Sequence, residues 1–277
     1  RGAELETHAY EFIHTTNAEK IFHMKFDVII GNPPYQLSDG GNGASAKPIY
    51  NYFVTQAKKL NPRYLSMIIP ARWYAGGKGL DSFRNEMLND NRITHLVDYV
   101  NAKDCFSGVS LGGGVCYFLW ERDSHSECEY TCIHDGKKSV RTRALNQFPV
   151  FVRYNEALSI IDKVLSKNEP SVSNHMSTRN PFGFPSSQRE EKNVTNGISL
   201  FTSSGKFNVS LQSVTQGKDL IDKYKVMFSK VTSEHAGEPD QSGMFKVLSR
   251  AQLLLPNEVC TDSYLIAFSS DDKTIAE

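Results

Sequence analysis

The sequence predicts an α/β protein in which a doubly wound sheet is followed by a smaller, β-rich α+β domain. Short apolar runs alternate with amphipathic segments between Phe26 and Trp120, as strands and helices alternate in sheets of this class. One apolar run ends in the sequence Asn-Pro-Pro-Tyr at residues 32–35. From Phe151 onward the composition shifts to segments rich in Ser, Asn, Gly and Pro.

The first predicted strand is residues 28–30. Both of its faces are apolar and Gly31 follows it, so we expect a fully buried strand of a parallel sheet. Ligands of open α/β sheets bind at the carboxyl ends of the strands, where the tetrapeptide 32–35 follows. Its two prolines stiffen the loop and leave carbonyl acceptors unpaired, beside the Asn32 amide and the Tyr35 ring. These groups suit a planar ligand with an amino group, such as an unstacked adenine, although a simple turn is the alternative.

The rest of the first domain follows from the periodicity of apolar residues. A Gly-rich loop at 37–46 precedes a helix at about 48–60, in which Ile49, Phe53 and Ala57 recur at helical spacing. The further elements that we expect are a strand at 64–69 ended by Pro70, a helix at 80–88, a strand at 93–99, and two strands near a sheet edge at 112–120 and 128–133.

We place the end of the first domain at residue 148. The second domain, 149–277, begins with a helix at 155–166. A loop-rich stretch follows, and we expect its short strands at 198–202, 224–229, 246–248 and 264–267.

Composition excludes several classes of protein. The 277 residues include 31 basic and 31 acidic ones, a balance that argues against a histone-like nucleic-acid binder but leaves room for a local basic cleft. Five irregularly spaced cysteines favour a reducing compartment, so we expect a cytoplasmic protein. No run approaches the roughly 18 apolar residues of a membrane span, so we expect no membrane partner. The first residue is Arg1, so we expect the chain to start inside a longer protein.

The tetrapeptide resembles motif IV of the amino-methyltransferases. The helix, strand and helix after it are similar to motifs V to VII, and residues 103–108 with 112–120 are similar to motif VIII. This order resembles the gamma class of DNA adenine-N6 methyltransferases of the type II or type IIG restriction–modification kind, in which a target-recognition domain follows motif VIII. Three segments of the second half look like that domain: 182–183, 224–226 and 254–265.

The resemblance implies a fold and a chemistry. Residues 1–148 would be the carboxyl-terminal part of the catalytic domain, motifs IV to VIII, within a doubly wound Rossmann-like methyltransferase sheet. Residues 149–277 would be all or part of the DNA-binding, target-recognition domain. The substrate would be double-stranded DNA, from which the target adenine is flipped. The catalytic residues implied are Asn32, Pro33, Pro34 and Tyr35, with the Asn32 side chain and the Pro33 carbonyl accepting from the adenine amino group.

Aromatic residues would hold the flipped base. Tyr35 would stack on one face and Phe106 on the other, each stack contributing ~1–3 kcal/mol. A core role for Phe106 is an equal alternative. Lys47, Arg72 and Lys78 flank the site and are candidates for DNA phosphate contacts, although solvated loop charges are at least as common.

The glycine-rich cofactor motif of this family is absent from residues 1–25. We therefore expect a fragment that binds S-adenosylmethionine weakly or not at all, with the cofactor bound in the full-length parent. Its partner would be the remaining amino-terminal part of the same polypeptide, which in type IIG enzymes often carries a nuclease. Two alternatives stay open: a protein glutamine N-methyltransferase, and a DNA-specificity module with no activity of its own.

Two other clusters each have more than one interpretation. The basic segment 137–143 suits a hairpin along a DNA backbone, or a solvated face. His125, Cys128, Cys132 and His134 lie close in sequence, but their spacing along a strand converges poorly, so we expect no metal site.

Overall fold

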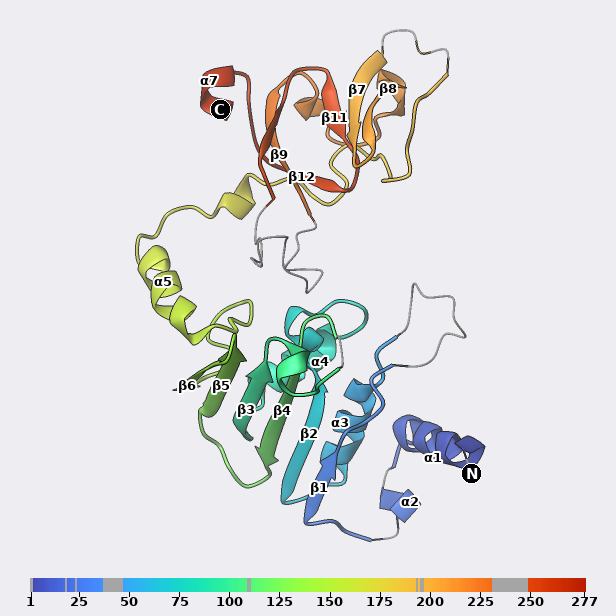
Figure 1. Ribbon diagram of the computed structural model, residues 1–277, viewed down its shortest axis with the longest axis vertical. Helices are drawn as coiled ribbons and strands as arrows, with labels where there is room; N and C mark the ends of the chain where they lie inside the picture. The colour runs from blue at the N-terminus through green and yellow to red at the C-terminus, as the bar shows by residue number, and fades with distance from the viewer. Residues whose placement is uncertain are drawn as a thin grey trace. The chain divides into compact units, whose positions relative to one another are not determined.

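The computed structural model describes residues 2–17, 19–22, 24–36, 47–108, 111–192, 194, 197–230 and 249–277 (Figure 1). The chain divides into two compact units, Arg1–Lys163 and Val164–Glu277, each with its own hydrophobic core. None of the described helices is long and apolar enough to cross a membrane.

A six-stranded mixed sheet forms the centre of the first unit, in the order β1-β2-β4-β3-β5-β6. Strands β1, β2, β3 and β5 run parallel to one another, while β4 and β6 run antiparallel to their neighbours. The strands are β1 (Val28–Gly31), β2 (Tyr64–Pro70), β3 (Ile93–Tyr99), β4 (Val115–Glu121), β5 (Cys128–His134) and β6 (Lys137–Arg143).

Helices precede, separate and follow these strands, and α3, η1 and α4 pack on one face of the sheet. The helical elements are α1 (Gly2–His14), α2 (Glu19–Phe22), α3 (Tyr50–Lys59), η1 (Ala71–Ala75), α4 (Asp81–Asn89), η2 (Ala102–Asp104) and α5 (Asn155–Leu165). Tyr50 and Val54 of α3 pack in one core with Trp73 of η1, Phe83 of α4 and Phe118 of β4. The Gln56 side chain donates to the Ile13 and Thr15 carbonyl oxygens (3.4 and 2.7 Å) and so ties the end of α1 to α3.

Strand pairing shows which residues share this helix-covered face. Leu65 of β2 pairs with Trp120 of β4, and Met67 with Phe118, and all four side chains are buried. On β1, Ile29 and Gly31 are in register with Leu65 and Met67, so they face the same side. The alternating residues, beginning with Val28 and Ile30, point to the opposite face. The sheet therefore has one buried face and one face that the described helices do not cover.

The predicted elements of the first unit are confirmed, with three corrections. Strand β4 lies between β2 and β3, so the prediction that it lies near a sheet edge was wrong; its run of apolar residues reflects an interior position. The prediction that 28–30 is fully buried was also wrong, because Val28 is 52% and Ile30 is 78% exposed. At α3, Ile49 and Ala57 are buried as expected, but Phe53 is only half-buried and Tyr52 is exposed. Tyr50 and Val54 complete the inward face in their place.

The basic segment 137–143 is strand β6, the second strand of a hairpin with β5. The two connecting residues, Asp135 and Gly136, both have positive φ (50° and 70°). An Asp-Gly pair with this backbone is the preferred two-residue hairpin turn, because its twist matches that of the strands.

The second unit is built from two three-stranded sheets, β10-β9-β12 and β11-β7-β8. Its elements are η3 (Val172–Asn174), β7 (Gly197–Thr202), β8 (Gly205–Ser210), η4 (Leu211–Ser213), η5 (Lys218–Leu220), β9 (Tyr224–Ser229), β10 (Gln252–Leu254), β11 (Glu258–Cys260), β12 (Tyr264–Ser270) and α7 (Lys273–Ala276). The strands expected at 198–202, 224–229 and 264–267 are confirmed, and β8, β10 and β11 were not predicted. The strand expected at 246–248 and the loop expected at 37–46 lie outside the described residues.

Lys225 is a fully buried lysine of the second unit. Its ammonium donates to the carbonyl oxygens of Leu220, Ile221, Lys223 and Leu255, at 2.7 to 3.2 Å. Burial lowers the pKa of Lys225 to about 8. The four acceptors compensate for the lost hydration and join η5, β9 and β10.

Candidate active site

The predicted catalytic tetrapeptide lies at the carboxyl end of β1. Because β1, β2 and β3 are parallel, the segments that follow them meet at one edge of the sheet. These segments are 32–36 after β1, η1 after β2, and the loop with η2 after β3. The fold thus brings these three segments, which carry Asn32, Arg72 and Phe106, to the same edge from positions far apart in the sequence (Figure 1).

The backbone of the tetrapeptide is held in place, and the side-chain amide of Asn32 is exposed. Pro33 is buried and Tyr35 is half-buried against the core, whereas Asn32 is exposed. The Ile49 amide donates to the Tyr35 carbonyl oxygen (3.1 Å), and Gln36 forms a β-bridge with Pro48. Within the described part of the chain, no hydrogen bond engages the Asn32 side chain. Its amide oxygen is available to a ligand, on a loop whose backbone is held in place.

The loop after β3 approaches Tyr35. Burial, followed by the nearby thiols of Cys105 and Cys116, raises the pKa of Tyr35 above its ordinary value of 10.0. Cys105 immediately precedes Phe106, which is half-buried and whose amide donates to the Ala102 carbonyl (2.8 Å). The two aromatic residues predicted to hold a base therefore lie on neighbouring loops.

A buried ion pair supports the loop from behind. The Asp98 carboxylate has no exposed surface and accepts from Arg153 Nε and Nη2 (2.7 and 2.6 Å) and from the Tyr130 hydroxyl (2.8 Å). Arg153 Nη1 also donates to the Gly113 carbonyl (2.9 Å), in the second half of the loop. This carboxylate raises the pKa of Arg153, against the opposing effect of burial. The pair fixes the loop base to the end of β3.

Gly114 closes this loop where only glycine fits. Its φ is +80°, and a Cβ atom there would lie 2.1 Å from the Tyr99 carbonyl oxygen. The Gly114 carbonyl accepts from the Ala71 amide (3.0 Å), which joins the loop to η1. The close backbone approach thus determines the path of the chain into β4.

The three predicted phosphate-binding residues are all exposed and lie on different segments. Arg72 is on η1, and a Cβ atom added at Gly113 would lie 3.9 Å from the Arg72 Cα atom. Lys47 precedes the Gln36–Pro48 bridge. Lys78 has a positive φ of 50° in the turn before α4. Only Arg72 is placed directly beside the loop after β3, and a role in DNA binding stays a prediction for all three.

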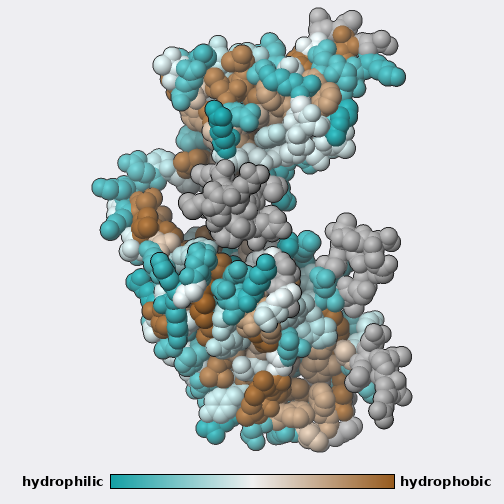
Figure 2. Space-filling view, in the orientation of Figure 1, coloured by the Kyte–Doolittle hydropathy of each residue, from teal (hydrophilic) through white to brown (hydrophobic). Residues whose placement is uncertain are grey.

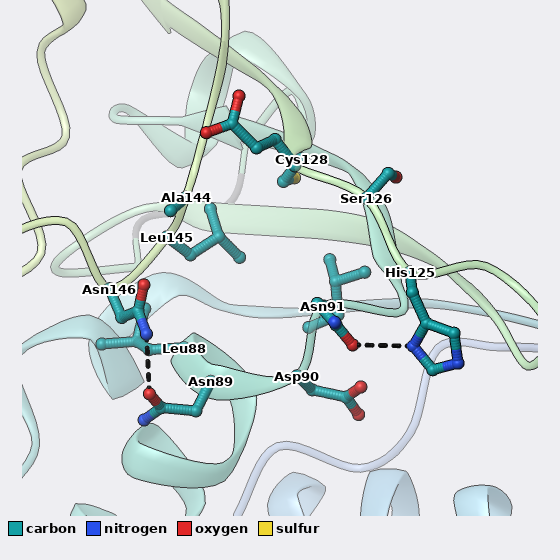
Figure 3. Close-up of a pocket in the computed structure, with 12 residues that line it drawn as sticks. Leu88, Asn89, Asp90, Asn91, His125, Ser126, Cys128, Ala144, Leu145 and Asn146 are labelled. Carbon is teal, nitrogen blue, oxygen red and sulfur yellow. Dashed lines mark hydrogen bonds between the residues drawn. The ribbon is translucent and has the colours of Figure 1, made fainter.

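A separate pocket lies at the opposite, amino-terminal end of β3 and β5 (Figure 3). Two polar pairs line it: His125 Nδ1 with Asn91 Oδ1 (3.0 Å), and Asn146 Nδ2 donating to Asn89 Oδ1 (2.8 Å). Asp90, which also lines it, accepts from Arg92 (2.7 Å) and from the Trp120 ring nitrogen (2.9 Å). These contacts pair the polar groups with one another, and the pocket is distant from the tetrapeptide. We assign it a structural role.

Sequence reasoning missed Asp98 and Arg153. A lone carboxylate at an inward-facing position of an apolar strand is a signal for a buried ion pair, but the partner, 55 residues away, is not readable from spacing. At the cluster considered for zinc, Cys128 and Cys132 are buried on the helix-covered face and His125 pairs with Asn91. Among the described residues no three His, Cys, Asp or Glu side chains converge as metal ligands.

Comparison with known proteins matches the first 106 residues to restriction–modification methylases. Residues 1–106 match the model of the Eco57I restriction-modification methylase family. An "Uncharacterized adenine-specific methylase" of Mycoplasma pneumoniae is 41% identical over 128 residues, a stretch that covers 43% of this chain and 30% of that relative. The chain thus matches less than a third of the relative's length.

Two solved structures are similar over most of the chain. The type IIL restriction-modification enzyme MmeI, solved in complex with DNA, is 10% identical with a TM-score of 0.48, over 88% of this chain and 41% of that one. The type IIG restriction endonuclease BpuSI is 12% identical with a TM-score of 0.38, over 87% and 41%. Both sequence identities are below 25% and both TM-scores are below 0.5, so these two structures assign no role to this chain. The sequence comparison remains: the first 106 residues are similar to the Eco57I restriction-modification methylase family.

Proposed function

We propose that this chain comes from a gamma-class DNA adenine-N6 methyltransferase of the type II or type IIG restriction–modification kind. Residues 1–148 would be part of its doubly wound, Rossmann-like catalytic domain, and residues 149–277 all or part of its target-recognition domain. The observation that carries the proposal is the tetrapeptide 32–35 at the carboxyl end of β1, with its amide exposed. It lies inside the stretch that matches restriction–modification methylases.

The residues at this edge suit a flipped adenine. The Asn32 side-chain oxygen and the Pro33 carbonyl would accept the two hydrogens of the adenine amino group, which orients its nitrogen. Tyr35 and Phe106, on neighbouring loops, would stack on the faces of the base, each worth ~1–3 kcal/mol. Arg72, Lys47 and Lys78 would contact the phosphates of double-stranded DNA.

The cofactor of such an enzyme is S-adenosylmethionine, and the residues present do not fit its methionine part. Residues 1–25 contain a single glycine, Gly2, and the described ones form helices α1 and α2 instead of a strand with a glycine-rich turn. We therefore propose that the cofactor is bound in the full-length parent, which includes an amino-terminal part absent from this chain. The chain alone would bind S-adenosylmethionine weakly or not at all.

The test is methyl transfer from radiolabelled S-adenosylmethionine to mixed-sequence duplex DNA by the full-length parent. We expect label on adenine N6, and loss of at least about 100-fold in rate for Asn32→Ala, since removing one preorganised hydrogen-bonding partner costs ~3 kcal/mol. Asn146→Ala, in the pocket at the other end of the sheet, is the matched control and should retain activity. The 277-residue chain alone should transfer no label.

The competing functions predict different labels. A protein glutamine N-methyltransferase would label protein and leave DNA unlabelled, but the curated relative is described as adenine-specific. A specificity module without activity would leave DNA unlabelled even as the full-length parent. An Asn32→Ala parent that methylates adenine at the wild-type rate would remove the tetrapeptide from the active site.

A further inference from the structure

The hairpin of β5 and β6 turns at the same end of the sheet as the tetrapeptide. Strand β5 is parallel to β3, so the carboxyl ends of both strands lie side by side, and the turn at Asp135 and Gly136 follows β5. Lys137 and Lys138 come directly after this turn and are exposed. Teal side chains gather over the β5–β6 side of the sheet in Figure 2. A tight turn thus places two cations at the end of the sheet that carries the candidate site.

The other two cations of β6 differ from this pair. Arg143 is buried, its Nη2 donates to the Val152 carbonyl oxygen, and its guanidinium lies 4.5 Å from the centre of the Tyr130 ring. Arg141 is exposed but lies further along the strand, away from the turn. The strand is therefore not a uniformly charged surface, and its two free lysines are the ones beside the turn.

Exposed cations follow each of the parallel strands at this end of the sheet. They are Lys47 after β1, Arg72 and Lys78 after β2, Lys103 after β3, and Lys137 and Lys138 after β5. Among the described residues, none of these side chains forms an ion pair with a carboxylate. At the opposite end of the sheet, by contrast, Arg92 pairs with Asp90 (2.7 Å) and Arg122 with Asp123 (2.9 Å). A row of cations without compensating acids attracts a polyanion.

We propose that Lys137 and Lys138 bind the phosphate backbone of duplex DNA on one flank of the target adenine. This inference rests on the proposed function, which makes duplex DNA the substrate. Strand β6 is five strand spacings from β1, which corresponds to roughly 25 Å. Each strand of the duplex rises 3.4 Å per nucleotide, so the hairpin would reach phosphates about seven base pairs from the adenine.

A contact at this distance positions the duplex without reading its sequence. Lysines that neutralise phosphates release counterions, which adds affinity that falls as the salt concentration rises. The row of cations follows the order of the strands, so a duplex held near Arg72 and again at the hairpin runs across the sheet in one direction. The hairpin would thereby fix the direction of the duplex at the candidate site.

Asp135 is the acidic residue of the turn, and its charge opposes this binding. Its exposed carboxylate lies 3.5 Å from His134 Nδ1. Asp135→Asn removes the charge and keeps the turn, because Asn-Gly favours the same backbone as Asp-Gly. This substitution should tighten DNA binding roughly twofold, since it removes a repulsion near the phosphates.

The first measurement is the salt dependence of DNA binding by the full-length parent. Fluorescence anisotropy with mixed-sequence duplex DNA gives the slope of log affinity against log salt concentration between about 50 and 200 mM. Each phosphate contact contributes ~0.9 to this slope, so Lys137→Gln combined with Lys138→Gln should make it shallower by about 2. Lys137→Arg combined with Lys138→Arg retains both charges and should leave the slope unchanged.

The matched control is Lys25→Gln combined with Lys59→Gln. Both lysines are exposed and lie at the opposite end of the same sheet, before β1 and at the end of α3. This control should bind DNA with the wild-type slope, and all variants should melt at the wild-type temperature. Equal slopes for the wild type and the Lys137/Lys138 glutamine variant would overturn the proposal and show that the hairpin is a solvated face.

The second measurement tests the distance along the DNA. Once the methylated adenine is mapped, the duplex is shortened on one flank at a time, from about ten to about four base pairs. For the wild-type parent, one of the two cuts should raise KM at least about fivefold with kcat unchanged, because it removes the phosphates at the hairpin. For the Lys137/Lys138 glutamine variant, the same cut should leave KM unchanged. A variant as sensitive to this cut as the wild type would contradict the proposal.

Two outcomes separate this inference from the proposed function. The binding measurement requires neither cofactor nor methyl transfer. A parent that methylates nothing, but whose salt slope becomes shallower in the glutamine variant, would leave the hairpin contact standing while the proposed function fails. A parent that methylates adenine with the same slope in both forms would remove the hairpin contact alone.

Discussion

Replacing Arg153 with methionine is expected to destabilise the first unit by about 3 kcal/mol. The substitution removes two hydrogen bonds to Asp98 and one to the Gly113 carbonyl, while the methionine retains most of the apolar volume. Asp98 is left fully buried with only the Tyr130 hydroxyl as a donor. Removing one partner of a buried pair costs ~3–5 kcal/mol, and the lower value applies because the Arg153 side chain is 20% exposed and water can reach the vacated position.

The assay is urea unfolding followed by tryptophan fluorescence. Both tryptophans of the chain, Trp73 and Trp120, are buried in the first unit, so their emission reports this unit alone. With a slope of about 2 kcal/mol per molar urea, the midpoint should fall by about 1.5 M. The control is Arg141→Met on β6, an exposed arginine whose loss should change stability by less than ~0.5 kcal/mol.

A second substitution tests why Arg153→Met lowers the stability of the first unit. If the cost arises from an uncompensated carboxylate, Asp98→Asn combined with Arg153→Met should be more stable than Arg153→Met alone, since the buried charge is gone. A single variant within ~1 kcal/mol of the wild type, or a double variant no better than the single one, would refute this account.

Two other substitutions test local features of the first unit. Gly114→Ala should cost at least ~2 kcal/mol more than Gly113→Ala in the same urea assay: both residues have positive φ (80° and 91°), but only at Gly114 would the Cβ meet a backbone oxygen at 2.1 Å. Asp90→Asn should lower the free energy of unfolding by about 2 kcal/mol at neutral pH and by progressively less below about pH 4. Burial raises the pKa of the Asp90 carboxyl, but its bonds to Arg92, Lys58 and Trp120 outweigh burial and hold this pKa well below the ordinary 3.8.

Each of these two predictions has a result that would contradict it. Equal urea midpoints for the two glycine variants would show that the loop before β4 can move away from Tyr99. For Asp90, the sign follows from a lowered folded-state pKa: its stabilisation is present above 3.8 and is lost as the pH falls through that value toward the folded-state pKa. A difference from Asp90→Asn that stays constant from pH 7 to pH 2 would contradict it.

The order of strands and helices in the first unit was predictable from the sequence. Buried runs such as 93–99 and amphipathic segments such as Asp81–Asn89 are local patterns, because each depends on which of a few neighbouring side chains face the core. The tetrapeptide at the end of 28–31 was found in the same way, since Gly, Pro and Asn have their own local backbone preferences.

Tertiary structure alone decided how these elements combine. The insertion of β4 between β2 and β3 is a non-local pairing that apolar periodicity does not encode. The inward face of α3 and the pairing of Asp98 with Arg153 also depend on what packs against them.

Strand β1 shows which of its properties follow from the sequence and which follow from the tertiary structure. Its sequence is that of a strand covered on both sides, because composition reflects the environment for which a segment is selected. In this chain its outward residues are exposed, because burial depends on which other segments are present. The sequence by itself determined what kind of strand β1 is, and only the tertiary structure showed that its described neighbours cover one face and one edge.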